Sequence, residues 1–187
     1  MFHICGVKSK LYNNIPPGIE YIGIHPMAGK ERDGFDNADG DLFKGTGFII
    51  IQLPATHQNS VELMRELAEH IGAARIAVTD AARHDEIIAY TSDLMHVSAA
   101  ALCINFHPDL SSAYTAGAFR DCTRVADINA AAWAELLTAN RVNTVAALDR
   151  YISDLMRLRA AISENKRDIL FELLQISAGN KREILSR

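Results

Sequence analysis

The feature of this sequence that most constrains its fold is a change of pattern near Thr79. Before that point the apolar residues stand in short runs flanked by Gly, Pro and Asn, namely Phe2–Cys5, Tyr21–His25 and Phe48–Ile51. After it, apolar residues recur at helical spacing over long stretches, and Pro108 is the only proline that remains. Short apolar runs are typical of buried parallel strands, and long periodic stretches are typical of helices. We therefore expect an α/β layer over residues 1–80 and an all-helical domain over residues 81–187.

One helix is expected inside the first region. Between Ser60 and Gly72, apolar side chains recur every three or four residues, at Val61, Met64, Ala68 and Ile71. Ser60 is placed to cap this helix and Gly72 to end it. A further apolar run, Ala74–Val78, follows. Because a strand, a helix and a second strand in this order form a right-handed crossover in nearly all proteins, we expect parallel pairing here.

The second region is expected to contain several consecutive helices. Asp80 can cap a helix that runs to about Asn105, and Asn129 can cap another that runs to Asn140. Two more apolar stripes predict a long helix and a final one, through Val145, Leu148, Ile152, Leu155, Met156 and Ile162, and then Ile169, Leu173 and Ile176. One chain of this size does not cover so much apolar surface, so we expect dimerisation through the helical region. A self-contained helical bundle is the alternative.

Charge and cysteine content argue against several kinds of partner. The 187 residues carry a formal net charge of -4, so the chain lacks the basic field that holds nucleic acid or an anionic membrane. Cys5, Cys103 and Cys122 are far apart and odd in number, which favours neither a disulfide framework nor a zinc site. The acidic stretch Asp36–Asp41 resembles a calcium loop only superficially, since Gly47 stands where the bidentate Glu belongs. We expect no metal.

The sequence also predicts a cytoplasmic protein. No apolar run comes near the ~18 residues that span a bilayer, and the N-terminus carries no export signal. Three unpaired cysteines fit a reducing compartment.

His25 is a candidate catalytic residue because it ends an expected strand. Pro26 follows directly and favours an extended conformation for His25. Ligands of open α/β sheets bind at such strand ends, and a histidine has a pKa of about 6.5, which suits a general base. For a single histidine, a structural or surface role is the alternative.

Arg120 and Arg124 are candidates for binding an anion. On one helical face, four residues apart, their like charges repel by ~0.2 to 0.5 kcal/mol. An anionic ligand would remove the repulsion, and a planar guanidinium suits a carboxylate. The alternative is surface pairing of Arg124 with Asp121 and Asp127.

A polar cluster interrupts the apolar helix that follows Asp80. Ser92, Asp93 and His96 gather within one turn, and His84 and Asp85 precede them in the same helix. Such a cluster either faces a pocket or belongs to a mixed surface, and the pattern alone leaves both interpretations open.

Several segments together resemble the prephenate dehydrogenase family, in the same order and with similar spacing along the whole chain. HPMAGKERDG and NADGDLFKG, residues 25–34 and 37–45, resemble the family's HPMAG...G...NAxxxLFxG stretch. RHDEIIAYTSDLMH, residues 83–96, resembles HDxxxAxxSHLPH, and GAFRDCTRVAD, residues 117–127, resembles GGGFRDxTRIA. Trp133 and Asn140 also fall where the family has W and N.

The resemblance implies both a fold and an activity. The fold would be the remnant of a Rossmann-type NAD(P)-binding domain followed by an all-helical domain that intertwines with its twin in a homodimer. The activity would be the oxidative decarboxylation of prephenate to 4-hydroxyphenylpyruvate, in which NAD or NADP takes a hydride and CO2 leaves. Such a reaction belongs to tyrosine biosynthesis.

The resemblance also implies roles for particular residues. His25 matches the histidine that accepts a hydrogen bond from the ring hydroxyl and helps to deprotonate it. Arg124 matches the arginine that binds a substrate carboxylate, and Arg120 would assist it. Three further positions match residues that line the substrate pocket: Ser92, His96 and Gly117.

The chain departs from the family pattern at its beginning. It contains no GxGxxG, and residues 3–8 resemble the late Rossmann segment D-x-G-S-V-K, with His3 in place of the Asp. We therefore expect roughly the first ninety to a hundred residues of a typical member to be missing, so that only the nicotinamide side, at Cys5 and Gly6, remains. Gly6 stands where many members have a Ser whose hydroxyl can orient the catalytic histidine, and Asp93 and Met95 replace a His and a Pro.

Two alternative functions stay open at this point. One is a non-catalytic dimeric module that binds prephenate, hydroxyphenylpyruvate or tyrosine. The other is an arogenate dehydrogenase, whose substrate differs in the side-chain amine. Catalysis by this polypeptide alone is not expected, because loss of the pyrophosphate cradle removes most of the contacts that hold the nicotinamide beside the substrate. A separate upstream polypeptide could supply the missing part.

Overall fold

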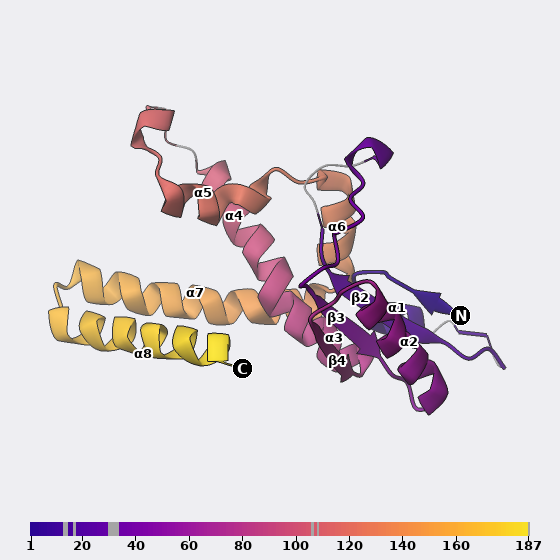
Figure 1. The fold of residues 1–187 in the computed structure, drawn as a ribbon. Helices are drawn as coiled ribbons and strands as arrows, with labels where there is room; N and C mark the ends of the chain where they lie inside the picture. The colour runs from indigo at the N-terminus through magenta and orange to yellow at the C-terminus, as the bar shows by residue number, and fades with distance from the viewer. Residues whose placement is uncertain (13–14, 17, 30–33, 106, 108, 187) are drawn as a thin grey trace. The chain divides into compact units, whose positions relative to one another are not determined.

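The structure is a computed structural model, and it describes residues 1–12, 15–16, 18–29, 34–105, 107 and 109–186 (Figure 1). Residues 30–33, inside the HPMAGKERDG segment, lie outside the described residues. The chain forms two compact units, Met1–Thr144 and Val145–Arg187. The domain boundary expected near residue 80 stays a prediction.

The first unit contains a four-stranded sheet in the order β1–β2–β3–β4. Its strands are β1 (Phe2–His3), β2 (Ile22–Met27), β3 (Gly47–Ile51) and β4 (Arg75–Thr79). The pairs β1/β2 and β3/β4 are parallel, whereas β2 and β3 are antiparallel, with His25 opposite Ile49. The expectation of parallel strands is therefore wrong for β2 and β3. Among the described residues between them, only a short 3-10 turn, η1 (Phe35–Asn37), is helical, and a parallel pair needs a longer crossover.

One face of the sheet is covered by the helix α2 (Gln58–His70). The core between them contains Ile22, Ile24, Phe48 and Ile50 from the strands and Val61, Met64 and Ala68 from the helix. The parallel β3–α2–β4 unit is as expected, and Gly72 follows the helix with φ +84°, a conformation that glycine adopts readily. The expected cap at Ser60 is wrong, because the helix begins at Gln58 and the Ser60 hydroxyl donates to Glu20 instead.

A long helical segment follows β4. Its first part, α3 (Ala81–Ile88), continues through the π-helical η2 (Ala89–Asp93) into α4 (Leu94–Ile104). A separate short helix, α1 (Ser9–Tyr12), lies near the N-terminus. Asp80 caps α3 as expected, accepting from the N–H of Arg83. π-Helical turns are rare and frequent at functional sites.

Smaller helices complete the first unit. They are η3 (Ser112–Tyr114), α5 (Gly117–Thr123), η4 (Arg124–Ala126) and α6 (Ala130–Ala139). Asn129 caps α6 by accepting from the N–H of Ala132, as the sequence predicts. Both α5 and η4 pack against α4 (Figure 1).

The segment Ala81–Ile104 requires one correction to the sequence analysis. By length and composition it is apolar enough to cross a membrane, with a mean hydropathy of 1.5, although no run of that kind was expected. This finding is weak support for a membrane span, because Asp85 and Asp93 within the segment are buried and hydrogen-bonded to other parts of the protein.

The second unit is a pair of antiparallel helices, most of α7 (Arg141–Ser163) and all of α8 (Arg167–Ser186) (Figure 1). Asn165, with φ +52°, lies in the turn between them. Most members of the expected apolar stripes are exposed: Val145, Ile152, Leu155, Met156, Ile162, Ile169 and Ile176. Phe171 and Leu174, which were not expected in a stripe, are exposed as well. A single hairpin of two helices cannot cover both of its faces, so this surface is free to pack against another molecule.

Candidate functional site

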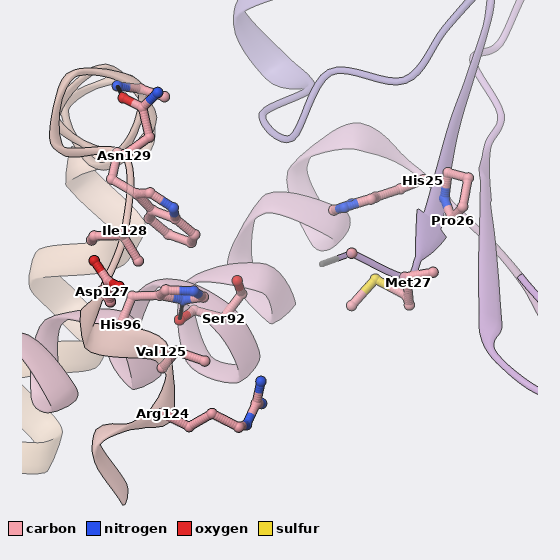
Figure 2. Close-up of a pocket in the computed structure, with 14 residues that line it drawn as sticks. His25, Pro26, Met27, Ser92, His96, Arg124, Val125, Asp127, Ile128 and Asn129 are labelled. Carbon is pink, nitrogen blue, oxygen red and sulfur yellow. Dashed lines mark hydrogen bonds between the residues drawn. The ribbon is translucent and has the colours of Figure 1, made fainter. Parts of the chain in front are cut away.

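A pocket of about 530 Å³ lies in the first unit, between the end of β2 and the helices that follow β4 (Figure 2). Its lining comes from four places in the sequence: His25, Pro26, Met27, Ala28 and Gly29; Ser92 and His96; Arg124, Val125, Asp127 and Ile128; and Asn129, Ala132 and Trp133. The pocket thus brings together residues from a strand end, the π-helical turn with α4, η4 and α6. Strand ends of α/β sheets are common sites for ligands.

The helical wall of the pocket is built around His96. Its Nδ1 lies 2.9 Å from the main-chain oxygen of Ser92, one turn earlier. The indole of Trp133, from α6, stacks on the imidazole with ring centroids 3.6 Å apart. These two contacts hold the ring from its edge and its face, so His96 presents a fixed surface to a ligand.

His25 forms the opposite wall and is the first member of a buried chain of polar groups. Its Nδ1 lies 2.8 Å from Nε2 of His84, and Nδ1 of His84 lies 2.8 Å from a carboxylate oxygen of Asp85. Asp85 also accepts from the main-chain N–H groups of Lys8 and Ser9 at 2.9 and 2.8 Å. The sheet and the segment after β1 therefore meet α3 through this carboxylate.

Burial sets the charge states in this chain of groups. Burial, with smaller contributions from His84 and Lys8, lowers the pKa of His25 to about 4. Burial alone would raise the pKa of Asp85, but hydrogen bonds from His84, Ser9 and Lys8 outweigh it and lower that pKa. At neutral pH, His25 is therefore a neutral imidazole and Asp85 a carboxylate. A neutral imidazole can accept a hydrogen bond from a hydroxyl group.

Lys8 supplies a buried positive charge beside this network. Its ammonium donates to the main-chain oxygen of Ile24 at 2.7 Å, and its side chain is fully buried. Burial lowers the pKa of Lys8 to about 8, while Cys5 and Asp85 act in the opposite direction. The negative charge of Asp85 thus favours the charged form of Lys8, but burial outweighs it.

Arg124 contributes the cation that lines the pocket. It begins η4, directly after α5 ends at Thr123. Figure 2 shows its guanidinium directed from η4 toward the space in front of β2, where His25 and Met27 lie. A guanidinium in such a position can bind a carboxylate with two parallel hydrogen bonds.

Asp93, in the π-helical turn, faces a second buried network. Its carboxylate accepts from Nδ2 of Asn140 at 2.9 Å and from the hydroxyl of Thr144 at 2.8 Å. The same Asn140 amide donates to the main-chain oxygen of Asp85 at 3.0 Å. Asp93 therefore fixes the start of α7 against the helix that carries Ser92 and His96.

The structure groups some of the expected site residues and separates others. His25, Ser92, His96 and Arg124 line one pocket. Four other expected residues are not among those that line it: Arg120 and Gly117 on α5, and Cys5 and Gly6 after β1. A side chain at Gly6 would meet Leu136 at 3.2 Å, and Gly6 offers no hydroxyl to His25.

Reasoning from the sequence missed the connection between His25 and His84. It singled out His84 and Asp85 only as polar residues in an apolar helix. The sequence shows that His84 and Asp85 are neighbours. It does not show that His84 contacts His25, which lies 59 residues away in the chain. Trp133 was noted through the family resemblance alone, without its stacking on His96.

The described residues do not fit the pyrophosphate of a dinucleotide. That group binds at an open helix N-terminus behind a glycine-rich turn. Carboxylates already occupy the helix starts that follow strands in this chain: Asp85 accepts from Lys8 and Ser9 at α1, Glu20 from His57 at α2, and Asp80 from Arg83 at α3. A pyrophosphate at any of these positions would face a negative charge.

The part of the chain that the structure describes contains no group of three or more His, Cys, Asp or Glu residues that could hold a metal ion. The three cysteines are exposed and unpaired with one another.

Two family models match the chain. One, described as the nucleotide-binding domain of prephenate dehydrogenase, matches residues 1–77, and the other, described as its dimerization domain, matches residues 80–176. The cyclohexadienyl dehydrogenase of Zymomonas mobilis is 33% identical over 172 residues, which cover 89% of this chain and 58% of that protein. Over the curated relatives that it matches, the chain spans between 41% and 58% of their length.

Solved structures agree with these matches. One is a prephenate dehydrogenase from A. aeolicus in complex with hydroxyphenyl propionate and NAD+, which is 25% identical and has a TM-score of 0.75. The match covers 88% of this chain and 59% of that one. Synechocystis arogenate dehydrogenase is also 25% identical, with a TM-score of 0.79 over 98% of this chain and 68% of its own. The expected order, part of a nucleotide-binding domain followed by a helical domain, is thereby confirmed.

Proposed function

Because the chain belongs to the prephenate dehydrogenase family, we propose that it is the substrate-binding part of a prephenate dehydrogenase-type oxidoreductase of tyrosine biosynthesis. The single observation that carries this proposal is the convergence of His25 and Arg124 on one pocket. Prephenate has a ring hydroxyl and two carboxylates, so its recognition requires a hydrogen-bond acceptor and a cation at separate points. The pocket offers both.

Each residue of the pocket then has a distinct task. Arg124 binds a substrate carboxylate, and His25 accepts a hydrogen bond from the ring hydroxyl and receives its proton. His96, held by Ser92 and Trp133, belongs to the helical wall, across the pocket from His25. Arg120 would assist from α5 by its charge alone, and Gly117 would shape the backbone that leads to Arg124.

The overall reaction of such an oxidoreductase balances without a net proton. The ring hydroxyl would give its proton to His25, the ring carboxylate would leave as CO2, and the phenol oxygen would take the proton back. A bound nicotinamide would accept the hydride from the ring carbon that bears the hydroxyl. The electron pair released with CO2 makes the ring aromatic.

NAD or NADP is the proposed hydride acceptor, and the nicotinamide would approach the side of Cys5 and Gly6. Carboxylates occupy the starts of α1, α2 and α3, the helices that follow strands, so these described residues would not hold the pyrophosphate. We therefore expect the chain alone to bind substrate better than cofactor.

Calorimetry tests this proposal directly. The chain is titrated separately with 4-hydroxyphenylpyruvate and with NAD+. Saturable binding of 4-hydroxyphenylpyruvate supports the proposal, and its absence at millimolar concentration contradicts it. Tight binding of NAD+ would show that the carboxylate-capped helix starts have been misjudged.

A second candidate function is a non-catalytic dimeric module that binds prephenate, hydroxyphenylpyruvate or tyrosine. The carboxylate caps of α1, α2 and α3 favour it, because a pyrophosphate at these helix starts would face a negative charge. Mixing the chain with a separately produced nucleotide-binding half of a relative distinguishes the two: recovery of NAD+ reduction supports the enzyme, and failure to recover it supports the module.

Arogenate is the alternative substrate, since one structural neighbour is an arogenate dehydrogenase. The two substrates share the ring hydroxyl and ring carboxylate and differ at the side chain. Titration with both, under the same conditions, identifies the preferred one.

The proposed assembly is a cytoplasmic homodimer. Residues 80–176 match a dimerization domain, and the apolar faces of α7 and α8 are exposed in one chain. The free cysteines suit a reducing compartment. Sedimentation at micromolar concentration should give a mass of two chains, and a monomer would contradict the assembly.

A further inference from the structure

The buried hydrogen-bonded groups His25, His84 and Asp85 include two residues, His84 and Asp85, to which the proposed function gives no role. His84 and Asp85 are each only 1% exposed, and neither lines the pocket. The two imidazoles lie with Nδ1 of His25 at 2.8 Å from Nε2 of His84 and with their planes 48° apart. One short contact between two ring nitrogens requires that one of them carry a hydrogen and the other a lone pair.

The direction of these hydrogens follows from Asp85. Its carboxylate accepts from two main-chain N–H groups, those of Lys8 and Ser9, which can only donate. Its third contact, with Nδ1 of His84 at 2.8 Å, is therefore satisfied when that nitrogen carries a hydrogen. Main-chain groups thus fix the carboxylate, and the carboxylate fixes the tautomer of His84.

His84 then determines His25. With hydrogen on Nδ1, a neutral His84 has a lone pair on Nε2, which can only accept. His84 is 1% exposed, and burying a neutral imidazole costs less free energy than burying a charged one. Nδ1 of His25 must then donate, which leaves its Nε2 without a hydrogen.

We propose that His84, held by Asp85, is a positioning residue that fixes His25 in the Nδ1–H tautomer, so that Nε2 is the atom that meets the substrate hydroxyl. This inference rests on the proposed function for its substrate, but its structural content does not depend on any ligand. His84 acts through His25 and does not itself touch the substrate.

The arrangement also determines where charge goes during proton transfer. When the hydroxyl proton moves to Nε2, His25 becomes an imidazolium with hydrogens on both nitrogens. Its Nδ1–H remains bonded to His84, and the Asp85 carboxylate at the far end of the chain stabilises the added positive charge through His84. The same proton returns from Nε2 to the phenol oxygen after CO2 leaves, so the chain of groups ends as it began.

Nuclear magnetic resonance of the ring nitrogens tests the tautomer in the intact chain without any ligand. The chain is produced with 15N-labelled histidine, and His25 is assigned by comparison with His25→Gln. At about pH 7, Nδ1 of His25 should be protonated and Nε2 should show the shift of an unprotonated nitrogen. A hydrogen on Nε2 of His25, or hydrogens on both nitrogens of His84, would overturn the proposal. Spectra of the wild-type protein are sufficient for this test.

Two variants of His84 separate positioning from packing. His84→Gln retains an acceptor oxygen near the former Nε2 and should preserve the His25 tautomer. His84→Leu is of similar size but cannot accept, and it should give a mixture of His25 tautomers. An unchanged tautomer in His84→Leu, with the fold intact by amide spectra, also overturns the proposal.

Failure of this inference and failure of the proposed function have different signatures. Binding of 4-hydroxyphenylpyruvate is measured on the same samples. If the wild-type chain shows the expected His25 tautomer but does not bind 4-hydroxyphenylpyruvate, the positioning role of His84 stands and the proposed function fails. If it binds but carries the hydrogen on Nε2, the proposed function stands and His84 is not the positioning residue.

An effect on turnover is expected wherever the chain is assembled into an active enzyme. His84→Leu should lower kcat by at least tenfold with little change in KM, because Arg124 still binds the carboxylate. His84→Gln should recover most of kcat. Equal losses in the two variants would assign His84 a packing role only.

Discussion

The two walls of the pocket differ in how firmly their side chains are held. On the sheet side, α3 buries four residues, Ala81, His84, Asp85 and Ile88. His84 lies within hydrogen-bond distance of His25, and Asp85 in turn holds His84. On the helical side, α5 and η4, which carry Arg120 and Arg124, bury none. The fold of one chain therefore holds His25, the proposed proton acceptor, in place. The segment α5–η4, in contrast, buries no residue in one chain, and a partner in the proposed homodimer would supply its further packing.

The largest expected effect is a loss of stability when the hydrogen bonds on the sheet side of the pocket are removed. Asp85→Ala leaves the N–H groups of Lys8, Ser9 and His84 buried without an acceptor, and should lower the free energy of unfolding by about 3 to 5 kcal/mol. Urea unfolding followed by circular dichroism measures this loss. Asp80→Ala is the control, since it removes only the cap of α3 and should cost about 1 kcal/mol. Equal losses in the two variants would contradict the account of Asp85.

The second prediction concerns the helical wall. Arg124→Ala should weaken the binding of 4-hydroxyphenylpyruvate by about 1.5 to 3 kcal/mol, because a charge-assisted hydrogen bond to a carboxylate is lost. Calorimetry measures the change, which corresponds to roughly 10- to 150-fold in Kd. Arg65→Ala, on α2 and outside the pocket, removes the same charge and should leave the affinity unchanged. An unaltered Kd in Arg124→Ala would exclude Arg124 as the carboxylate ligand.

The third prediction follows from the pKa of His25, which is about 4 in the fold and 6.5 without burial. Between these values the unfolded chain binds a proton at this site and the folded chain does not. The stability contributed by a neutral His25 is therefore complete above pH 6.5 and is lost as the pH falls toward 4. Between about pH 6.5 and 5.5 the loss should approach 1 kcal/mol.

Urea unfolding of the wild type and His25→Gln over this pH range measures that difference. The pKa of His3 is also lowered to about 4, mainly by burial, but His3 is present in both proteins and cancels. The Asp85 pKa is lowered, so its contribution is lost only at more acidic pH. Parallel pH profiles for the two proteins would show that His25 is already protonated or exposed in the fold.

The smallest expected effect separates the two arginines. Arg120 lies on α5 and does not line the pocket, so Arg120→Ala should weaken ligand binding by less than about 0.5 kcal/mol. The same calorimetric titration measures it. A loss as large as that of Arg124→Ala would mean that Arg120 binds the second carboxylate directly, as the family resemblance implies it could.

Local signals in the sequence predicted much of the fold. Asp80 and Asn129 cap their helices because a carboxylate or amide oxygen reaches a nearby N–H, which is a local interaction. The cap expected at Ser60 failed because Glu20, 40 residues away, accepts from its hydroxyl. The direction of β2 against β3 was also missed, since pairing direction depends on the connection between strands and not on their composition.

The site was predicted in part for the same reason. The strand end before Pro26 and the run of residues around Arg124 carry local signals, and both line the pocket. The contact of His25 with His84 has no local signal in the sequence. It joins β2 to α3, and two other strands, β3 and β4, lie between them in the chain. The packing of α3 against the end of β2 brings the two imidazoles together, and no local pattern in the sequence reports it.

A crystal structure of the chain with 4-hydroxyphenylpyruvate tests the central claim most directly. We expect the ligand carboxylate on the guanidinium of Arg124 and the ring hydroxyl at about 2.6 to 3.2 Å from Nε2 of His25. A ligand bound elsewhere, or a structure in which His25 and Arg124 face different cavities, would contradict the assignment of this pocket as the substrate site.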